Sequence, residues 1–386
     1  MRKVPLAALL CMFALAFVSV LLSCSPAKTQ PGSAPATTPP VTTTPPAEQT
    51  TPAVTPQLQT AERIDSAAAL QTYLSELPAN TAATPHIIAV NISDFGTGHV
   101  EPGEGSTGSR PGAIGQIINE SNRFVHLDLS RSTMTNIGYG ALAACPLLTG
   151  VTIPSSVTAI GEYAFFECNS LTSVTIPSSV ITIETSAFSG CMSLASVTIS
   201  AGVTTIAQEA FSNCRILTSV TIPRSVTTIG PEAFGNCTSL TRVTIENGVT
   251  SIGAYAFNQC SSLTTVNIPP SVTNWGDFAF IMCSSLTGLT IENGVTGIGT
   301  GAFAHCTGLT SVNIPASVTR IGNTAFAECP NLTQVTFQGT IAPSSFGDRA
   351  FDGDLRTLYL SAGIATYYAE APVNISSKWW REAVGS

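Results

Sequence analysis

Apolar residues recur along most of this chain with a fixed period of 23 residues. In a representative unit, Leu171 to Cys191, the apolar positions hold Leu, Val, Ile, Val, Ile, Ala, Phe and Cys, and the varying positions hold mostly Ser, Thr, Asn and Gly. A fixed period with fixed apolar positions predicts a solenoid, because each unit can form one coil that buries its apolar side chains against the coils on either side.

Two columns of this pattern, one of cysteine and one of phenylalanine, continue almost without a break. We call them the Cys column and the Phe column, and we predict that both are structural ladders in the core. Their members are Cys145, Cys168, Cys191, Cys214, Cys237, Cys260, Cys283, Cys306 and Cys329, and Phe165, Phe188, Phe211, Phe234, Phe257, Phe280, Phe303 and Phe326.

Each unit contains one clear strand signal. Val174 and Ile176 alternate with polar residues, which is the periodicity of a β-strand with one buried face, and Pro177 then ends the strand because it cannot donate to the ladder. Identical strands of successive coils must lie parallel, about 4.8 Å apart. The stretch from Ala187 to Cys191 is too short for a full helix and favours a single turn of 3₁₀ or α-helix on the opposite side of the coil.

The spacing L-x-x-V-x-I-P-x-x-V-x-x-I-G-x-x-A-F-x-x-C resembles the BspA-type subfamily of bacterial leucine-rich repeats over residues 124–360. We therefore predict an α/β solenoid: a right-handed leucine-rich-repeat coil with a parallel β-sheet on one face, about ten 23-residue repeats and a cap at each end. Trp275 and Leu289 depart from the Ile and Val of the pattern but remain apolar. The resemblance implies a surface-exposed adhesin that binds host matrix proteins or other bacteria.

A stack of coils leaves apolar surface exposed on its first and last coils, and we expect a cap to cover each. Residues 61–123 are the predicted N-terminal cap, with a helix from Ile64 to Leu77 that has Asp65 as its N-cap, a strand over 87–92 and a second helix over 113–118. Residues 361–386 are the predicted C-terminal cap, and we interpret its aromatic residues as cap core in preference to a ligand platform: Tyr367, Tyr368, Trp379 and Trp380.

The first residues have the pattern of an export signal. A basic start is followed by an apolar run from Val4 to Leu22, and Leu21-Leu22-Ser23-Cys24 resembles a bacterial lipobox, in which the cysteine is lipidated and becomes the mature N-terminus. We predict a lipoprotein signal peptide over 1–23, with lipidation of Cys24. A retained membrane-spanning helix is the alternative, because the apolar run approaches the length that a bilayer requires.

The next segment and the overall charge restrict the location and the partners. Residues 24–60 are rich in Pro and Thr, which predicts an extended, semi-rigid tether. The net charge is -8, and with 15 Lys and Arg the chain cannot build a basic stripe for nucleic acid. We expect the outer membrane or cell surface as the location, membrane contact through the lipid anchor only, and no nucleic-acid partner.

The Cys column raises two alternatives to a buried thiol ladder. Equivalent cysteines about 4.8 Å apart would fall within disulfide range, and export favours oxidation. Nine is an odd number, however, and equivalent side chains in a stack point side by side, so we favour a ladder in which cysteine acts as a small hydrophobe. Metal binding is disfavoured because no local C-x₂₋₄-C pair exists.

Other candidate chemistry is weak. Gly103 to Gly108 matches G-x-G-x-x-G but lies in a loop rich in Gly and Ser, with no strand leading into it, so we interpret it as a loop. The four histidines share no spacing: His86, His99, His126 and His305. No Ser, Cys or carboxylate has a recognisable base and orienting partner, so we predict no enzymatic activity, no catalytic residue, no cofactor and no metal.

The outward strand positions are the candidate site. They form two columns of mostly small hydroxyl and amide side chains, for which we keep three interpretations: a solvated surface, a contact face for protein or glycan, and an ice-binding array. Arg242, Gly288 and Gln334 interrupt the regular Thr lattice that ice binding needs. The predicted binding face comprises Ser173, Thr175, Ser196, Thr198, Ser219, Thr221, Arg242, Thr244, Thr265, Asn267, Thr290 and Asn313.

These observations predict a non-enzymatic, adhesin-like cell-surface lipoprotein. It would bind host matrix proteins, glycans or other bacteria through the exposed face of the solenoid, where many weak contacts add through multivalency. The alternative is a structural envelope lipoprotein with no external ligand.

Overall fold

The computed structural model describes residues 64–98, 100, 109–338, 347–351, 357–360 and 365–367. The chain divides into two compact units, Met1–Gln57 and Leu58–Ser386, and every described residue belongs to the second. The predicted signal peptide, Cys24 and the tether therefore lie outside the described residues. Within the described part of the chain, no helix combines the length and the apolar character needed to cross a bilayer.

The N-terminal elements are two helices and two strands: α2 (Ala67–Glu76), β1 (His86–Ala89), α3 (Ala113–Ser121) and β2 (Val125–Asp128). The prediction of Asp65 as N-cap is wrong, because the helix begins one residue later and the hydroxyl of Ser66 accepts a hydrogen bond from Ala69 N–H (3.2 Å). Ile64 is held in a bridge to Val90, which keeps the chain extended just before the helix. The two helices pack against each other, and β1 pairs with β2 in parallel.

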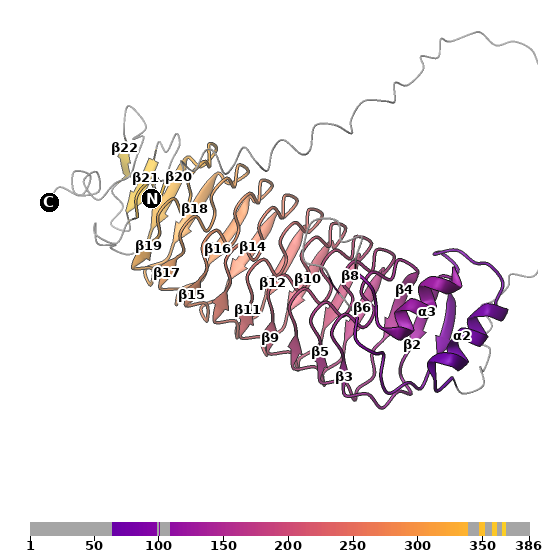
Figure 1. The fold of residues 1–386 in the computed structure, drawn as a ribbon. Helices are drawn as coiled ribbons and strands as arrows, with labels where there is room; N and C mark the ends of the chain where they lie inside the picture. Colours follow the sequence, from indigo (N-terminus) through magenta and orange to yellow (C-terminus); the bar gives the residue numbers. More distant parts are fainter. Residues whose placement is uncertain are drawn as a thin grey trace, which may run out of the picture. The chain divides into compact units, whose positions relative to one another are not determined.

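The coils form one row of long strands and one row of short strands, which Figure 1 shows following one another in order. The long strands are β4 (Leu148–Thr152), β6 (Ser173–Ile176), β8 (Ser196–Ile199), β10 (Ser219–Ile222), β12 (Arg242–Ile245), β14 (Thr265–Ile268), β16 (Gly288–Ile291), β18 (Ser311–Ile314) and β20 (Gln334–Phe337). After them, β21 (Thr357–Leu360) pairs in parallel with β20, and β22 (Ala365–Tyr367) pairs antiparallel with β21.

A second row of two-residue strands follows the corner of each coil, and the sequence analysis did not predict it. It comprises β3 (Asn136–Ile137), β5 (Ala159–Ile160), β7 (Thr182–Ile183), β9 (Thr205–Ile206), β11 (Thr228–Ile229), β13 (Ser251–Ile252), β15 (Asn274–Trp275), β17 (Gly297–Ile298) and β19 (Arg320–Ile321). The fold is thus a β-solenoid of about nine turns with parallel sheets, one ladder cysteine marking each turn.

The remaining side of each coil, from the glycine after the short strand to the ladder cysteine, forms turns where a short helix was expected. We call this segment the turn arc. Tyr163 N–H donates to Thr185 O (3.0 Å) and Phe165 N–H to Ala187 O (2.8 Å), both in the next coil, whereas Cys168 N–H donates to Phe165 O (3.3 Å) within its own coil. Successive N–H groups therefore bind alternately to the carbonyl three residues earlier in the same coil and to the next coil, so consecutive helical hydrogen bonds do not form.

Every arc has left-handed backbone at two positions, those of Tyr163 and Glu167 in one coil. At the first of these positions the φ angle is 56° at Tyr163, 54° at Glu209 and 52° at Thr324, and only Gly140 and Gly301 supply glycine there. Left-handed backbone costs a non-glycine residue about 1 kcal/mol or more, so inter-coil hydrogen bonding must offset the strain. The sequence signal for a turn was hidden because most residues at the first position, such as Tyr163 and Glu209, are not turn formers.

Both rows of strands are interrupted near Trp275. The long row separates between β16 and β18 as well as between β8 and β10, and the short row separates between β15 and β17. Trp275 replaces the usual Ile and lies edge-on to the rings of Phe280 and Phe303 (centroids 6.4 and 5.9 Å away), and its indole Nε1 is buried without a hydrogen-bond partner. Leu289, in the usual Val position, is only half-buried.

The first coil is closed by two glycines of the preceding loop. Gly98 N–H donates to Tyr139 O (2.9 Å), and Gly112 N–H donates to Ala141 O (3.0 Å). Any side chain at Gly98 would place its Cβ 2.1 Å from Gly140 O, so only glycine permits this approach. The backbone of the N-terminal segment therefore supplies the donors that a further coil would have supplied.

Candidate binding face

The predicted binding-face residues all lie on the outer side of the long strands. Each alternates with a buried residue, so that Ser173 and Thr175 are exposed while Val174 and Ile176 are buried. All twelve are exposed to solvent. Parallel pairing without register shifts places equivalent residues side by side within a block of strands, as for Thr175 beside Thr198. We call these two columns the long-strand face.

The hydroxyl groups of this face are not used by the fold. Among the described residues, the side chains of Thr175, Thr198, Thr221 and Thr244 make no hydrogen bond to protein atoms. The same holds for the serines of the neighbouring column, Ser173, Ser196 and Ser219. These groups can both donate and accept, and they are available to a ligand.

Threonines elsewhere in the same coils behave differently. Thr241 Oγ1 donates to Thr218 O (3.0 Å), Thr264 Oγ1 donates to Thr241 O (3.1 Å), and Thr227 Oγ1 donates to Thr204 O (3.3 Å), each spanning 23 residues. These hydroxyls tie each coil to the one before it. Similar side chains thus form two classes, one that binds the neighbouring coil and one that faces solvent.

Asn267 is an exception on the face, because its side-chain amide donates to the carboxylate of Glu292 in the next coil. Arg242 is the one charged member of the predicted face. It lies beside Ser219 on one side and Thr265 on the other. Its guanidinium is exposed and has no hydrogen-bond or ion-pair partner among the described residues. The two interruptions of the long row divide the face into three blocks.

The Phe column lies in the core, and each of its members is fully buried. Adjacent rings stack nearly parallel, with centroids 4.8 to 5.4 Å apart. Phe351 continues the stack beyond Phe326 at 5.0 Å. The rings provide a continuous apolar spine that carries the long-strand face.

The Cys column is also buried, and all nine thiols are free. Each thiol from Cys168 onward donates to a backbone carbonyl of the coil before it, for example Cys191 Sγ to Phe165 O (3.1 Å) and Cys237 Sγ to Phe211 O (3.3 Å). Cysteine therefore acts as a donor as well as a small hydrophobe, which the sequence analysis did not recognise.

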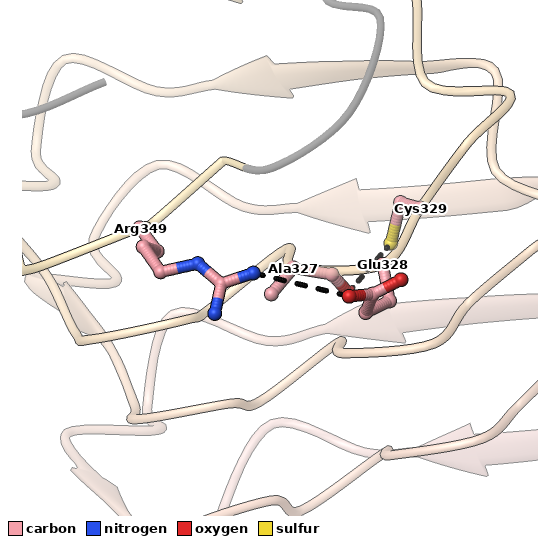
Figure 2. Close-up of polar contacts among 4 residues, drawn as sticks. All are labelled: Ala327, Glu328, Cys329 and Arg349. Atoms are coloured by element: carbon pink, nitrogen blue, oxygen red, sulfur yellow. Dashed lines mark hydrogen bonds and ion pairs between the residues drawn. The ribbon is translucent and has the colours of Figure 1, made fainter. Parts of the chain in front are cut away.

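Burial makes these thiols resistant to ionisation. Desolvation raises the pKa of Cys168 and Cys237 to about 12 and raises the pKa of the other ladder thiols as well. The thiolate is the form that attacks disulfides and binds metals, so the column is chemically inert in the folded chain. At the last described turn, Cys329 Sγ also approaches Ala327 O (3.7 Å), while Arg349 and Glu328 form an exposed ion pair (3.9 Å) that Figure 2 shows.

The histidines do not form a site. His86 Nε2 lies 2.9 Å from Pro78 O, and His126 Nε2 lies 3.1 Å from Thr152 Oγ1. Burial lowers the pKa of His126, which favours its neutral form. Among the described residues, no group of three or more His, Cys, Asp or Glu is placed to hold a metal ion. His99 and the Gly103 to Gly108 motif lie outside the described residues, as do Tyr368, Trp379 and Trp380.

The sequence analysis missed three exposed side chains that break the repeat just before the long strands: Met192, Arg215 and Ile216. Met192 and Ile216 are large apolar residues, each 44% exposed, where other coils mostly carry Ser, Thr or Asn. Arg215 lies in the column of Met192. Arg242, by contrast, was included in the predicted binding face. The three missed residues could have been found because they depart from the consensus of the repeat. A search for periodicity disregards such departures as ordinary variation.

Comparison with known families decides the classification of these coils. The model of the BspA-type leucine-rich repeat region matches residues 135–253 and 227–356, in six copies. The chain belongs to the BspA-type leucine-rich repeat family. Members of this family share the solenoid scaffold, and leucine-rich repeats are typically non-catalytic binding scaffolds.

Solved structures with related repeats come from several bacteria. A leucine-rich repeat protein from Bacteroides ovatus is 24% identical, with 58% of this chain and 70% of that chain covered and a TM-score of 0.39. A leucine-rich cell-surface protein from Faecalibacterium prausnitzii is 28% identical (61% and 78% covered, TM-score 0.34), and the T. pallidum leucine-rich repeat protein is 31% identical (48% and 77% covered, TM-score 0.37).

A comparison with curated proteins gave no match. Because the TM-scores are low, the family assignment rests on the repeat match and not on superposition.

Proposed function

We propose that this protein is a non-enzymatic, adhesin-like surface lipoprotein that binds an external protein or glycan through the long-strand face. The observation that carries the proposal is the contrast between the two classes of threonine. Hydroxyls that stabilise the solenoid are bonded to the adjacent coil, whereas those of the long-strand face are exposed and unbonded. An extended array of free donors and acceptors supports recognition by many weak contacts.

The proposed domain organisation places this face away from the membrane. Residues 1–23 would be the lipoprotein signal, Cys24 the lipidated residue and 24–60 the tether, followed by an N-terminal cap over 61–123, the solenoid over 124–360 and a C-terminal cap over 361–386. A Pro-rich tether extends by about 3.1 Å per residue in polyproline conformation. Such a spacer would hold the solenoid at a distance from the bilayer, at the outer membrane or cell surface.

The binding role is tested with the chain carrying Thr221→Glu and Thr244→Glu. Two carboxylates on neighbouring strands would repel ligand groups and displace hydroxyl contacts, so binding to an array of matrix proteins, mucin-type glycans and whole bacteria should fall roughly tenfold. The control carries Gln208→Glu and Gln259→Glu, which add the same charge on the turn arc. Absence of binding by the unmodified chain to any array member would remove the proposal.

The location is tested by protease treatment of intact cells that express the full chain. Cleavage of the solenoid before lysis would support exposure at the surface. Protection until lysis would instead favour the structural envelope role. A Cys24→Ala variant should be released from the membrane fraction, because it lacks the lipidation site, and retention of that variant would contradict the lipid anchor.

A further inference from the structure

The long-strand side of the solenoid carries an unusual charge distribution. In the nine segments that run from a ladder cysteine to the end of the following long strand, between Cys145 and Phe337, only Arg215 and Arg242 are charged. None of these segments contains a carboxylate, although the chain has a net charge of -8. The acidic residues of these coils lie on the turn arcs, such as Glu209 and Glu232, or follow the strands, such as Glu246.

Both arginines are exposed and have no hydrogen-bond or ion-pair partner for their side chains among the described residues. Ser239 N–H donates to Arg215 O (3.0 Å), which places Arg215 against the segment that continues to Arg242 three residues later. The two cations therefore border the same part of the long-strand side, in adjacent coils. An unpaired guanidinium presents a planar fork of donors that matches a carboxylate.

Exposed apolar side chains lie next to these cations. Met192 occupies the position of Arg215 one coil earlier, and Ile216 follows Arg215 directly. Both are 44% exposed, whereas the equivalent positions in later coils are small and polar, as at Thr238 and Ser239. Met and Arg are enriched at protein contact surfaces, and a flexible thioether adapts to varied apolar groups.

We propose that Met192, Arg215, Ile216 and Arg242 form a docking patch for an acidic polypeptide segment that also carries apolar side chains. Carboxylates of the partner would pair with the two guanidinium groups, and an apolar side chain would cover Met192 and Ile216. The free hydroxyls of Ser219 and Thr221 would bind the peptide groups of the partner. The inference rests on the proposed function and specifies the partner of the same face.

The apolar residues favour a polypeptide over an anionic glycan. A sulfated or carboxylated glycan would satisfy the arginines and the hydroxyls, but it has no large apolar side chain to cover Met192 and Ile216. Charge complementarity alone would therefore leave half of the patch without a role. A polypeptide with both acidic and apolar side chains uses all four residues.

The test measures binding of the purified full chain to immobilised probes: a random copolymer of glutamate and tyrosine, polyglutamate and dextran sulfate. Each patch residue is replaced by a residue that other coils carry at its position, which leaves the fold intact. The first variant is Arg215→Thr with Arg242→Ser, and the second is Met192→Thr with Ile216→Ser. Arg320→Thr and Ile181→Thr are matched controls, because both residues are exposed outside the segments that carry the patch.

We expect the copolymer to bind more tightly than polyglutamate, and each double variant to weaken copolymer binding roughly tenfold while the controls retain it. Higher salt should weaken binding of the unmodified chain, because exposed charge pairs are screened. Equal binding of the copolymer by all variants would overturn the inference. A preference for dextran sulfate that depends on the arginines alone would assign the face to an anionic glycan instead. If Thr221→Glu with Thr244→Glu abolishes array binding while the patch variants do not, the proposed function stands and this inference fails.

Discussion

Thr241 and Thr244 belong to the same coil and differ only in what they face. Thr241 Oγ1 donates to the carbonyl of Thr218 in the preceding coil, and Thr244 Oγ1 binds nothing in the described protein. Both side chains are exposed, so burial does not separate them. The comparison teaches that the repeat contains two polar systems: hydroxyl groups that bind the neighbouring coil, and hydroxyl groups that are exposed to solvent and bind no part of the described solenoid.

The two systems should respond differently to the same chemical change. Columns that connect coils, including the Cys column, contribute to stability because their donors satisfy backbone carbonyls of the neighbouring coil. The long-strand face contributes little, because its hydroxyls exchange bonds with water in the folded and unfolded states alike. Four predictions test this difference.

The largest effect is expected at alkaline pH. Burial raises the pKa of Cys237 from its ordinary value of 9.0 to about 12, so the folded state holds a proton that the unfolded state releases. The stability that this provides is complete below about pH 9 and decreases as pH rises toward about 12, because the unfolded state then releases the proton. Burial raises the pKa of the other eight ladder thiols as well, so the solenoid should unfold cooperatively at alkaline pH.

Circular dichroism during a pH titration measures this unfolding. A chain with Cys237→Ala and Cys260→Ala should show a shallower pH dependence, because two linked protons are removed. An unfolding midpoint that is independent of pH up to about 12 would contradict the linkage to buried thiols.

The next effect is loss of a ring from the Phe column. Phe234 stacks on Phe211 and Phe257, with both centroid distances 5.3 Å, and it is fully buried. Phe234→Ala removes these contacts and leaves a cavity, so the free energy of unfolding should fall by about 3 to 5 kcal/mol. Chemical denaturation measures this loss. A decrease similar to that of a surface threonine variant would show that the rings are not the spine of the fold.

The central comparison is tested by a matched pair, Thr241→Val and Thr244→Val. Thr241→Val removes a hydrogen bond to the preceding coil and should lower the free energy of unfolding by about 1 kcal/mol. Thr244→Val removes no intramolecular bond and should change it by less than about 0.5 kcal/mol. The order should reverse for ligand binding, which only Thr244→Val weakens. Equal effects on stability would remove the distinction between the two polar systems.

The smallest effect concerns a polar atom that is unbonded but buried. Among the described residues, the indole Nε1 of Trp275 is buried without a hydrogen-bond partner, unlike the exposed hydroxyl of Thr244. Trp275→Phe keeps an aromatic ring against Phe280 and removes the unsatisfied donor, so stability should rise by about 0.5 kcal/mol despite the smaller ring. Thermal unfolding measures the change. A clear loss of stability would mean that the area of the indole outweighs its unsatisfied N–H.

The features that depend on simple periodicity could be predicted from the sequence. Alternation around Val174 was sufficient to identify a parallel strand and to place all twelve proposed face residues in solvent. The short strands were missed because two residues, such as Thr182 and Ile183, contain no complete alternation. The turn arcs were mistaken for a helical turn, because left-handed backbone at Tyr163 and Glu209 has no residue-type signature.

The docking patch was harder to find for a different reason. Repeat analysis averages over coils, and averaging removes the information carried by the single departures at Met192, Arg215 and Ile216. The thiol hydrogen bonds were also hidden, because cysteine in an apolar column is normally interpreted by size alone. Residues that depart from the repeat consensus are therefore the better place to look for determinants of ligand specificity.

The backbone hydrogen bonds between the turn arcs of successive coils all run in the same direction along the solenoid. The donor N–H groups point toward higher residue numbers, as from Phe165 to Ala187 and from Phe211 to Ala233. One end of the rod accordingly offers acceptors, and Gly98 and Gly112 close that end. If two copies met end to end about a twofold axis, donors would face donors or acceptors would face acceptors. Hydrogen bonding between coils can therefore continue from one copy to another only in a head-to-tail arrangement.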